Sequence, residues 1–204
     1  KLGIEPEMDA AGNLIARLEG EDKTLPAIMT GSHLDTVPDS GRYDGALGCV
    51  AGLEVCQTLI ESGRKLRHPL EIVVFTDEEG FRFGSGMLGS GAMCGQDLHV
   101  SEEDLDMYGQ ARGDVLKACG LKVADLAMPD GPKTLCTVPG TACGTGASLH
   151  KKQIPVGVVT SIAGVSRFEI KITGEANHAG STVMEDRKDA LVAAARFVAR
   201  VPES

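Results

Sequence analysis

The chain has 204 residues, 42% of them hydrophobic, so it can bury a core and is not expected to be disordered. Its formal charge of −9 and pI near 5.0 disfavour binding to nucleic acid and to anionic membrane surfaces. Its six cysteines form no CxxC pair, and the sequence contains neither a leader nor a membrane-spanning apolar run, so we expect reduced thiols in a cytoplasmic protein.

The first part of the sequence predicts strands that alternate with a helix. Strands are expected at 13–19, 25–30 and 70–76, the last two apolar enough for the middle of a sheet. Between them, apolar residues recur at helical spacing from Gly45 to Ser62. This order indicates an open, mixed α/β sheet with helices on both faces, whose ligands bind beyond the carboxyl ends of the strands.

The remaining sequence predicts further helices and a second domain. One helix start is expected at Ser101–Asp104, and helix is expected over 114–126 around a break at Gly120. The pattern restarts after Pro155, with an alternating strand at 166–173 and an amphipathic helix at 189–201. This change suggests one domain over 1–154 and the beginning of another over 155–204.

The stretch GSHLDTVPDSGRYDG, residues 31–45, carries the first candidate site residues. His33 follows a strand, where a rigid element can hold a metal ligand. Asp35 lies two residues on, so its carboxylate could accept the second imidazole N–H and fix the tautomer. Asp44, just before the predicted helix, could bind one cation or bridge two. Taken singly, His33 is better explained as a solvated loop residue and Asp44 as a helix cap.

Glu78 and Glu79 form a second group, close behind the apolar strand at 70–76. Adjacent carboxylates repel each other unless a cation or a shared proton compensates. One of them could bind a metal while the other takes a proton from water and passes it to a leaving nitrogen. An acidic helix N-terminus would also explain the pair. The metal hypothesis therefore depends on two polar groups at the ends of two strands.

Three motifs resemble those of the hydantoinase/carbamoylase family of amidohydrolases, relatives of the dinuclear zinc aminoacylases and carboxypeptidases: GSHLDTVPDSGRYDGALG, FTDEEGFRFGSGMLGS and GVSRFEIKITGEANHAGSTVMEDRKDAL. The resemblance spans nearly the whole chain but only the first half of a typical member. We therefore expect the C-terminal part of the catalytic domain to be missing and this chain alone to be a weak or inactive enzyme. It implies a zinc-exopeptidase-like fold, with 155–204 as the start of a smaller α+β dimerisation domain, and hence a homodimer.

The resemblance also implies roles for individual residues. His33 and Glu79 match ligands of two different divalent metal ions, and Asp44 matches the carboxylate that bridges both. Glu78 matches the general base, and Asp35 matches the partner of the ligand histidine. Zinc or manganese is the expected metal, and cobalt or nickel could serve because mixed oxygen and nitrogen ligands do not select sharply among them.

His178, in GEANHAGST, matches a family histidine that reaches a neighbouring active site and steadies the oxyanion. The substrate implied is the ureido group of an N-carbamoyl-L-amino acid, with allantoate as the close alternative and dipeptides or N-acyl amino acids as more distant ones. A non-catalytic remnant that retains the dimerisation domain is an alternative of another class. A calcium module is disfavoured, because the acidic residues lack the spacing of an EF-hand loop.

One family motif, LHxEQGP with a histidine ligand, is absent from its expected place before IPVGVVTSIAG. The run CTVPGTACGTGASLH, residues 136–150, stands there instead. Reading the codons of 136–148 one base late permits VQYLELHVEQGPV, which contains the motif. We therefore interpret 136–149 as scrambled by two compensating frame slips, with the missing ligand near Ala142 and Cys143. His150 is the nearest substitute ligand but is disfavoured, because it lies beyond the expected position. Resequencing the coding DNA tests this hypothesis.

Overall fold

The computed structural model describes residues 2–126, 149, 151–155, 157–158, 160–161, 164 and 168–201. Apart from position 149, the segment 136–149 that we interpret as scrambled lies outside the described residues, as does His150. The chain divides into two compact units, Lys1–Ile154 and Pro155–Ser204. Within the described part, no helix is both long and apolar enough to cross a bilayer.

The first unit is built around a four-stranded sheet in the order β1-β2-β4-β3. Its elements are β1 (Glu7–Met8), β2 (Leu14–Leu18), β3 (Ile28–His33), α1 (Ala46–Glu61), β4 (Leu70–Phe75), α2 (Leu88–Met93), α3 (Arg112–Ala118) and a 3-10 helix (Val123–Asp125).

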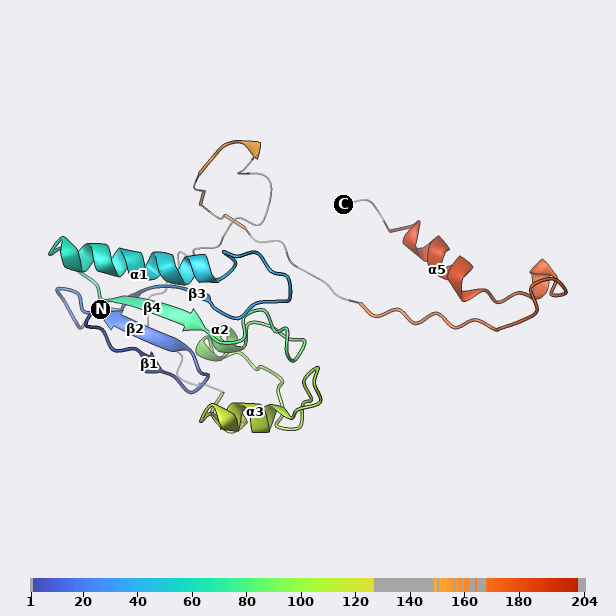
Figure 1. Cartoon of the computed structure of the whole chain (residues 1–204), viewed down its shortest axis with the longest axis horizontal. Helices are drawn as coiled ribbons and strands as arrows, with labels where there is room; N and C mark the ends of the chain where they lie inside the picture. The colour runs from blue at the N-terminus through green and yellow to red at the C-terminus, as the bar shows by residue number, and fades with distance from the viewer. Residues whose placement is uncertain are drawn as a thin grey trace. The chain divides into compact units, whose positions relative to one another are not determined.

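β3 and β4 pair in parallel, whereas β2 pairs antiparallel with both β4 and β1. The parallel register runs from Ile28 opposite Leu70 to His33 opposite Phe75. α1 supplies the crossover that parallel neighbours require. The carboxyl ends of β3 and β4 therefore meet at one edge of the sheet (Figure 1), which confirms the predicted open, mixed α/β arrangement.

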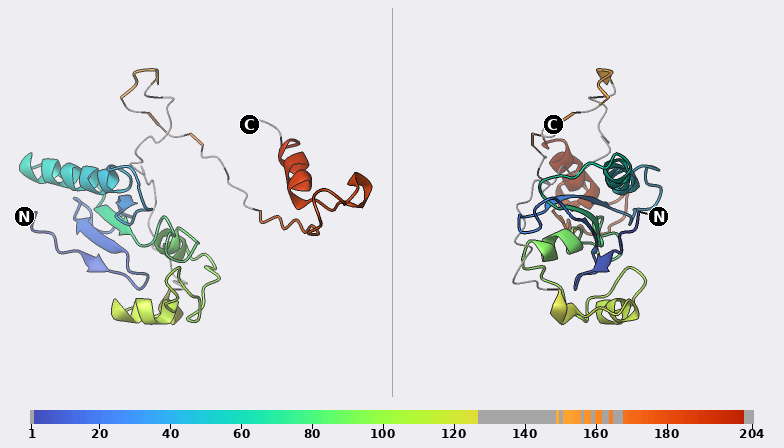
Figure 2. Two further views of the ribbon diagram at one scale, coloured as in Figure 1. Left: turned by 45° about the vertical axis from the view of Figure 1, so that its right-hand side comes forward. Right: turned by 90° about the vertical axis from the view of Figure 1, so that its left-hand side faces the viewer.

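Helices cover both faces of the sheet, with α1 on one side and α2 on the other (Figures 1 and 2). On the first face, Cys56 of α1 packs with Leu70 and Ile72 of β4. On the second face, Met93 of α2 packs with Val73. Successive side chains of a strand point to opposite faces, so a strand covered on both sides needs an apolar residue at nearly every position.

α1 packs on the sheet through small residues, namely Gly48, Cys49, Gly52 and Cys56. Larger apolar side chains of the same helix remain exposed, among them Leu47, Val50, Leu53 and Ile60. The spacing of apolar residues predicted this helix to within one residue at each end. It does not identify the face that packs, because the helix contacts the sheet through its least bulky side.

β3 lies three residues further along the chain than the strand predicted at 25–30. His33 is consequently the last residue of a strand and not part of a loop. Gly31 does not interrupt the strand, because the close pairing requires a residue without a side chain: a Cβ there would lie 2.4 Å from the carbonyl oxygen of Val73. α2 was not predicted, since its glycine-rich sequence lacks a helical period.

The helix start predicted at Ser101–Asp104 is wrong. The Asp104 carboxylate accepts the Ser101 N–H at 2.8 Å and the Arg112 Nε–H at 3.2 Å, which stabilises a turn instead. The helix of this region, α3, begins at Arg112 and ends before the predicted break at Gly120. The strand predicted at 166–173 is also wrong for 168–173, where no described strand supplies hydrogen-bond partners.

The described part of the second unit contains a 3-10 helix (Met184–Asp186) and α5 (Ala190–Val198). α5 confirms the helix predicted at 189–201. Asp189 caps it, because one carboxylate oxygen accepts the N–H groups of Leu191 at 2.9 Å and Val192 at 3.1 Å. The Glu175 N–H donates to the carbonyl of Lys188 at 2.9 Å and closes a loop that contains His178.

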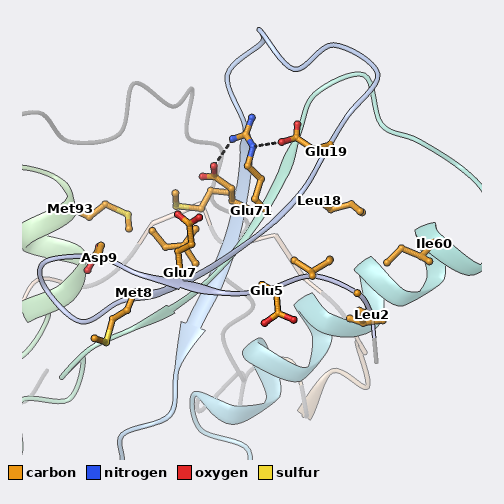
Figure 3. A pocket seen from close by; sticks show the side chains of 15 residues that line it. Leu2, Glu5, Glu7, Met8, Asp9, Leu18, Glu19, Ile60, Glu71 and Met93 are labelled. Atoms are coloured by element: carbon orange, nitrogen blue, oxygen red, sulfur yellow. Dashed lines mark hydrogen bonds and ion pairs between the residues drawn. The ribbon is translucent and has the colours of Figure 1, made fainter. Parts of the chain in front are cut away.

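A hollow of about 760 Å³ lies between the N-terminal segment and the sheet (Figure 3). On its wall, Arg17 of β2 forms ion pairs with Glu71 of β4 at 2.6 Å and with Glu19 at 3.3 Å. None of the predicted site residues lines this hollow, so it is separate from the candidate metal centre.

Candidate metal centre

The meeting ends of β3 and β4 bring His33, Glu78 and Glu79 together. One potential ligand atom from each side chain lies within 4.8 Å of the other two, a geometry that can hold a metal ion. His33 is only 8% exposed, and its Nε2 lies 3.5 Å from Oε2 of Glu78. Residues predicted from two separate stretches of sequence are thus neighbours in space.

The tautomer of His33 is set by the main chain of Asp35. The imidazole Nδ1 lies 2.9 Å from the Asp35 carbonyl oxygen, which can only accept, so Nδ1 carries the proton. Nε2 therefore presents a lone pair, as an imidazole must in order to bind a metal. The Asp35 carboxylate is more distant, at 3.6 Å from Nδ1. The carbonyl thus makes the contact that we predicted for the carboxylate.

The Asp35 carboxylate ties the two strand ends together. Its oxygens accept the N–H of Glu78 at 3.2 Å and the N–H of Glu79 at 2.9 Å. Asp35 therefore fixes two parts of the site. Its carboxylate holds the main chain of Glu78 and Glu79, and its carbonyl holds the ring of His33. Bonds from main-chain N–H groups to a carboxylate are among the stronger protein hydrogen bonds.

Asp44 is half-buried and lies just before α1. It does not belong to the group of three potential ligands, His33, Glu78 and Glu79. Its charge nevertheless contributes to the electrostatics of Glu78. The next residue, Gly45, lies against the imidazole of His33, since a Cβ at this position would be 2.6 Å from Nδ1. The bridging role of Asp44 stays a prediction.

Negative charge accumulates at this edge of the sheet. Burial raises the pKa of Glu78, a positive charge on His33 would lower it when that ring is protonated, and the carboxylates of Glu79, Asp35 and Asp44 raise it further. A divalent cation relieves this kind of repulsion. An imidazole with a free lone pair beside carboxylate oxygens is a donor set that fits zinc, manganese, cobalt or nickel.

His178 lies in the second unit, on an exposed loop. Its Nδ1 accepts the N–H groups of Gly180 and Ser181, each at 3.1 Å, so the neutral ring carries its proton on Nε2. Arg187 steadies the same loop by donating to the carbonyls of Ala179 and Thr182. The predicted reach of His178 into a neighbouring active site stays a prediction.

The loop after Glu79 is anchored by residues that the sequence did not single out. Arg82 donates through Nε to Asp106 at 2.6 Å, and the guanidinium of Arg112 lies 3.9 Å from the centre of the Phe83 ring. Both anchors attach the loop to the segment that leads into α3. No periodicity or motif connects residues this far apart in the sequence, so only the fold reveals them.

The anchoring carboxylate of Asp106 predicts a pH-dependent stability. Burial alone would raise the pKa of Asp106, but hydrogen bonds from Arg82 and from the N–H groups of Gln110 and Tyr108 outweigh it and hold the pKa below its usual value. Asp106→Asn should therefore lower the free energy of unfolding by a constant amount above about pH 4, the usual aspartate range. The difference from the parent chain should shrink as the pH falls further, through the pKa of the folded state.

Denaturant unfolding across an acid pH series measures this difference. Asp114→Asn, which changes an exposed aspartate in the first turn of α3, is the matched control and should give a small difference. If the free energy of unfolding of Asp106→Asn differs from that of the parent chain by the same amount down to strongly acid pH, the ion pair with Arg82 does not stabilise the fold.

Comparison with known proteins identifies the family. A model of peptidase family M28 matches residues 13–127, which is more than half of the chain. The whole chain is 41% identical to an N-carbamoyl-L-amino acid amidohydrolase of Geobacillus stearothermophilus and covers 50% of that protein. It is 36% identical to a probable allantoate deiminase of Oryza sativa subsp. japonica, with 96% of this chain and 41% of that protein aligned.

Solved structures give the same result. A hydantoinase/carbamoylase family amidase from Burkholderia ambifaria is 34% identical with a TM-score of 0.69, over 97% of this chain and 48% of the other. A homologue from Burkholderia vietnamiensis is 29% identical with a TM-score of 0.71, over 97% and 48%. The chain spans about half the length of the relatives that it matches. These matches confirm the resemblance carried by the three sequence motifs, and the chain belongs to peptidase family M28, as a relative of the hydantoinase/carbamoylase amidases.

Proposed function

We propose that this chain supplies metal-binding residues to a hydrolase that cleaves the ureido C–N bond of an N-carbamoyl-L-amino acid. The convergence of His33, Glu78 and Glu79 within 4.8 Å carries this proposal. The relatives named N-carbamoyl-L-amino acid amidohydrolases, each 41% identical to this chain in Geobacillus stearothermophilus and Paenarthrobacter aurescens, support the substrate class.

In this proposal, His33 and Glu79 would each hold one of two divalent ions, zinc or manganese, and the Asp44 carboxylate would be shared between the two. When bound, such ions polarise a carbonyl oxygen and acidify water. Glu78 takes a proton from the attacking water and delivers it to the leaving nitrogen. Asp35 holds the main chain of both glutamates in place during this transfer.

The second unit contributes an oxyanion donor. His178 has its proton on Nε2 because Nδ1 accepts two main-chain N–H groups. In a homodimer, the Nε2–H of one copy would donate to the substrate oxygen at the metal centre of the other, where negative charge develops during attack.

Metal content and ammonia release test the proposal. The chain is loaded with Zn²⁺ or Mn²⁺, dialysed and analysed for bound metal, and is then assayed with N-carbamoyl amino acids. Bound metal is expected, with at most weak ammonia release, since the chain spans about half the length of its relatives. A chain that is dimeric but binds no metal and releases no ammonia would instead be the non-catalytic remnant.

Allantoate is the second candidate substrate. Relatives described as allantoate deiminases in rice and soybean are 36% and 33% identical to this chain. A parallel assay with allantoate distinguishes the two substrates, because the preferred one should give the higher kcat/KM with the same preparation.

Paired glutamine variants separate the predicted roles of the two glutamates. Glu79→Gln should lose bound metal, because it removes a charged ligand. Glu78→Gln should retain metal and lower the rate by about 100-fold, the lower end of what acid–base catalysis contributes. Metal analysis and the ammonia assay on both variants give the result. If Glu78→Gln loses metal as Glu79→Gln does, Glu78 is a ligand and not the base.

A further inference from the structure

Asn13 is fully buried, and its side-chain amide bonds to both ends of the loop that carries the acidic pair. Oδ1 accepts the N–H of Thr76 at 3.0 Å, and Nδ2 donates to the carbonyl of Gly89 at 3.0 Å. The Gly89 N–H donates in turn to the carbonyl of Thr76 at 2.9 Å. The amide therefore completes a ring of hydrogen bonds at the base of the loop 76–89.

Asp9 fixes the orientation of this amide. One Asp9 oxygen accepts from Nδ2 of Asn13 at 2.8 Å, and the other accepts the N–H groups of Ala11 at 2.9 Å and Asn13 at 2.8 Å. A carboxylate can only accept, so Nδ2 must face Asp9 and Oδ1 must face Thr76. The side chain is thus held with its acceptor and donors already aligned for the loop.

The loop needs such a restraint because its two limbs are strained. Asp77 has a φ of 49° and Met87 a φ of 61°, in the left-handed region that residues with a Cβ rarely adopt. Residues in this region persist only where surrounding contacts hold them. The Leu88 N–H donates to the carbonyl of Asp77 at 3.2 Å, and the Met87 N–H donates to the carbonyl of Glu78 at 2.8 Å. A continuous ladder therefore leads from the ring to Glu78.

We propose that Asn13 is a positioning residue of the metal centre. By locking the base of the loop 76–89, it holds Glu78 and Glu79 against His33. The inference rests on the proposed metal-dependent function, because it assigns a purpose to the rigidity of this loop. It concerns a side chain that acts through the main chain of the loop and not through contact with substrate.

Two variants test the proposal. Asn13→Ala removes both hydrogen bonds from the side chain to the base of the loop. Asp9→Asn is milder, because Asn13 stays in place. The new amide NH₂ group faces the NH₂ group of Asn13, so the Asn13 side chain is no longer held in one orientation. Leu70→Ala is the matched control: it removes a core side chain that is 5% exposed at the far end of β4, where it pairs with Ile28.

The first readout is hydrogen exchange in the metal-free chain. The main-chain N–H groups of Glu78, Met87, Leu88 and Gly89 should exchange at least about tenfold faster in Asn13→Ala and to a smaller extent in Asp9→Asn, because these bonds then open locally. Leu70→Ala should lower the unfolding temperature without this local effect. The second readout is titration with Zn²⁺ alone, in which the dissociation constant should rise about 10- to 100-fold for Asn13→Ala and stay unchanged for Leu70→Ala.

The outcomes separate this inference from the proposed function. The locking role is overturned if the loop N–H groups exchange no faster in Asn13→Ala and Asp9→Asn than they do in Leu70→Ala. Faster loop exchange with an unchanged dissociation constant for Zn²⁺ overturns the link between the loop and the metal. If the parent chain binds no Zn²⁺, the metal centre itself fails, and exchange still decides whether Asn13 locks the loop.

Discussion

Replacing His33 with alanine is expected to weaken binding of Zn²⁺ by this chain by more than about 100-fold. The imidazole is the only nitrogen donor in the group of three, and its Nε2 lone pair is already oriented by the bond from Nδ1 to the Asp35 carbonyl. The two carboxylates that remain repel each other and lack a nitrogen ligand of the kind that zinc favours. Removing a residue that only supports a ligand lowers metal affinity by about 10- to 100-fold. Removing a ligand itself should therefore lower the affinity by more than about 100-fold.

His68→Ala is the matched control for this experiment. Its Nδ1 lies 2.8 Å from the Pro26 carbonyl, so it makes the same kind of main-chain bond. It precedes the start of β4, however, whereas Glu78 and Glu79 follow the end of that strand. Titration with Zn²⁺ against a chromogenic chelator, together with a thermal melt, measures both effects. His33→Ala that binds Zn²⁺ as the parent does, or His68→Ala that loses it equally, would place the metal elsewhere.

The sequence predicted the convergence of these residues because the relevant signals are local. The β-branched run that becomes β4 and the helical spacing that becomes α1 each lie within one short segment. Once strand, helix and strand are assigned, parallel pairing follows, and residues after the two strands must meet. His33 and Glu79 could therefore be placed together without coordinates, even though the start of β3 was predicted three residues too early.

The contacts that stabilise the site could not be predicted, because they are distant in sequence or chemically ambiguous. Asn13 bonds to residues 63 and 76 positions away, and its surroundings suggest only a turn before a strand. Asp35 offers both a carbonyl and a carboxylate to His33, and the spacing of two residues fits either. The orientation of the main chain at the end of β3 decides between them, and this orientation leaves no mark on the sequence.

Gly45→Ala is expected to destabilise the chain and to impair the metal centre at once. Gly45 has a φ of +67°, and an added Cβ would lie 2.5 Å from the carbonyl oxygen of His33 and 2.6 Å from its Nδ1. Its ψ is −57°, and the Ala46 N–H donates to the Asp44 carbonyl at 2.7 Å, so Gly45 is the central residue of a strained γ-turn. The cost combines the strain of this conformation, about 1–3 kcal/mol, with an overpacking cost of about 1–3 kcal/mol. Because the imidazole must move away from the new methyl group, the dissociation constant for Zn²⁺ should rise by at least about tenfold.

Gly63→Ala isolates the steric part of this effect. Gly63 lies beyond the other end of α1 with a φ of +65°, and a Cβ there would meet nothing within 4 Å. It should cost only the left-handed strain, about 1–2 kcal/mol, and leave Zn²⁺ binding unchanged. Denaturant unfolding and Zn²⁺ titration of both variants provide the comparison. Equal losses of stability with unchanged metal binding would mean that the imidazole of His33 is not held against Gly45. The tight contact between the start of α1 and the end of β3 would then have no part in setting the position of the ligand.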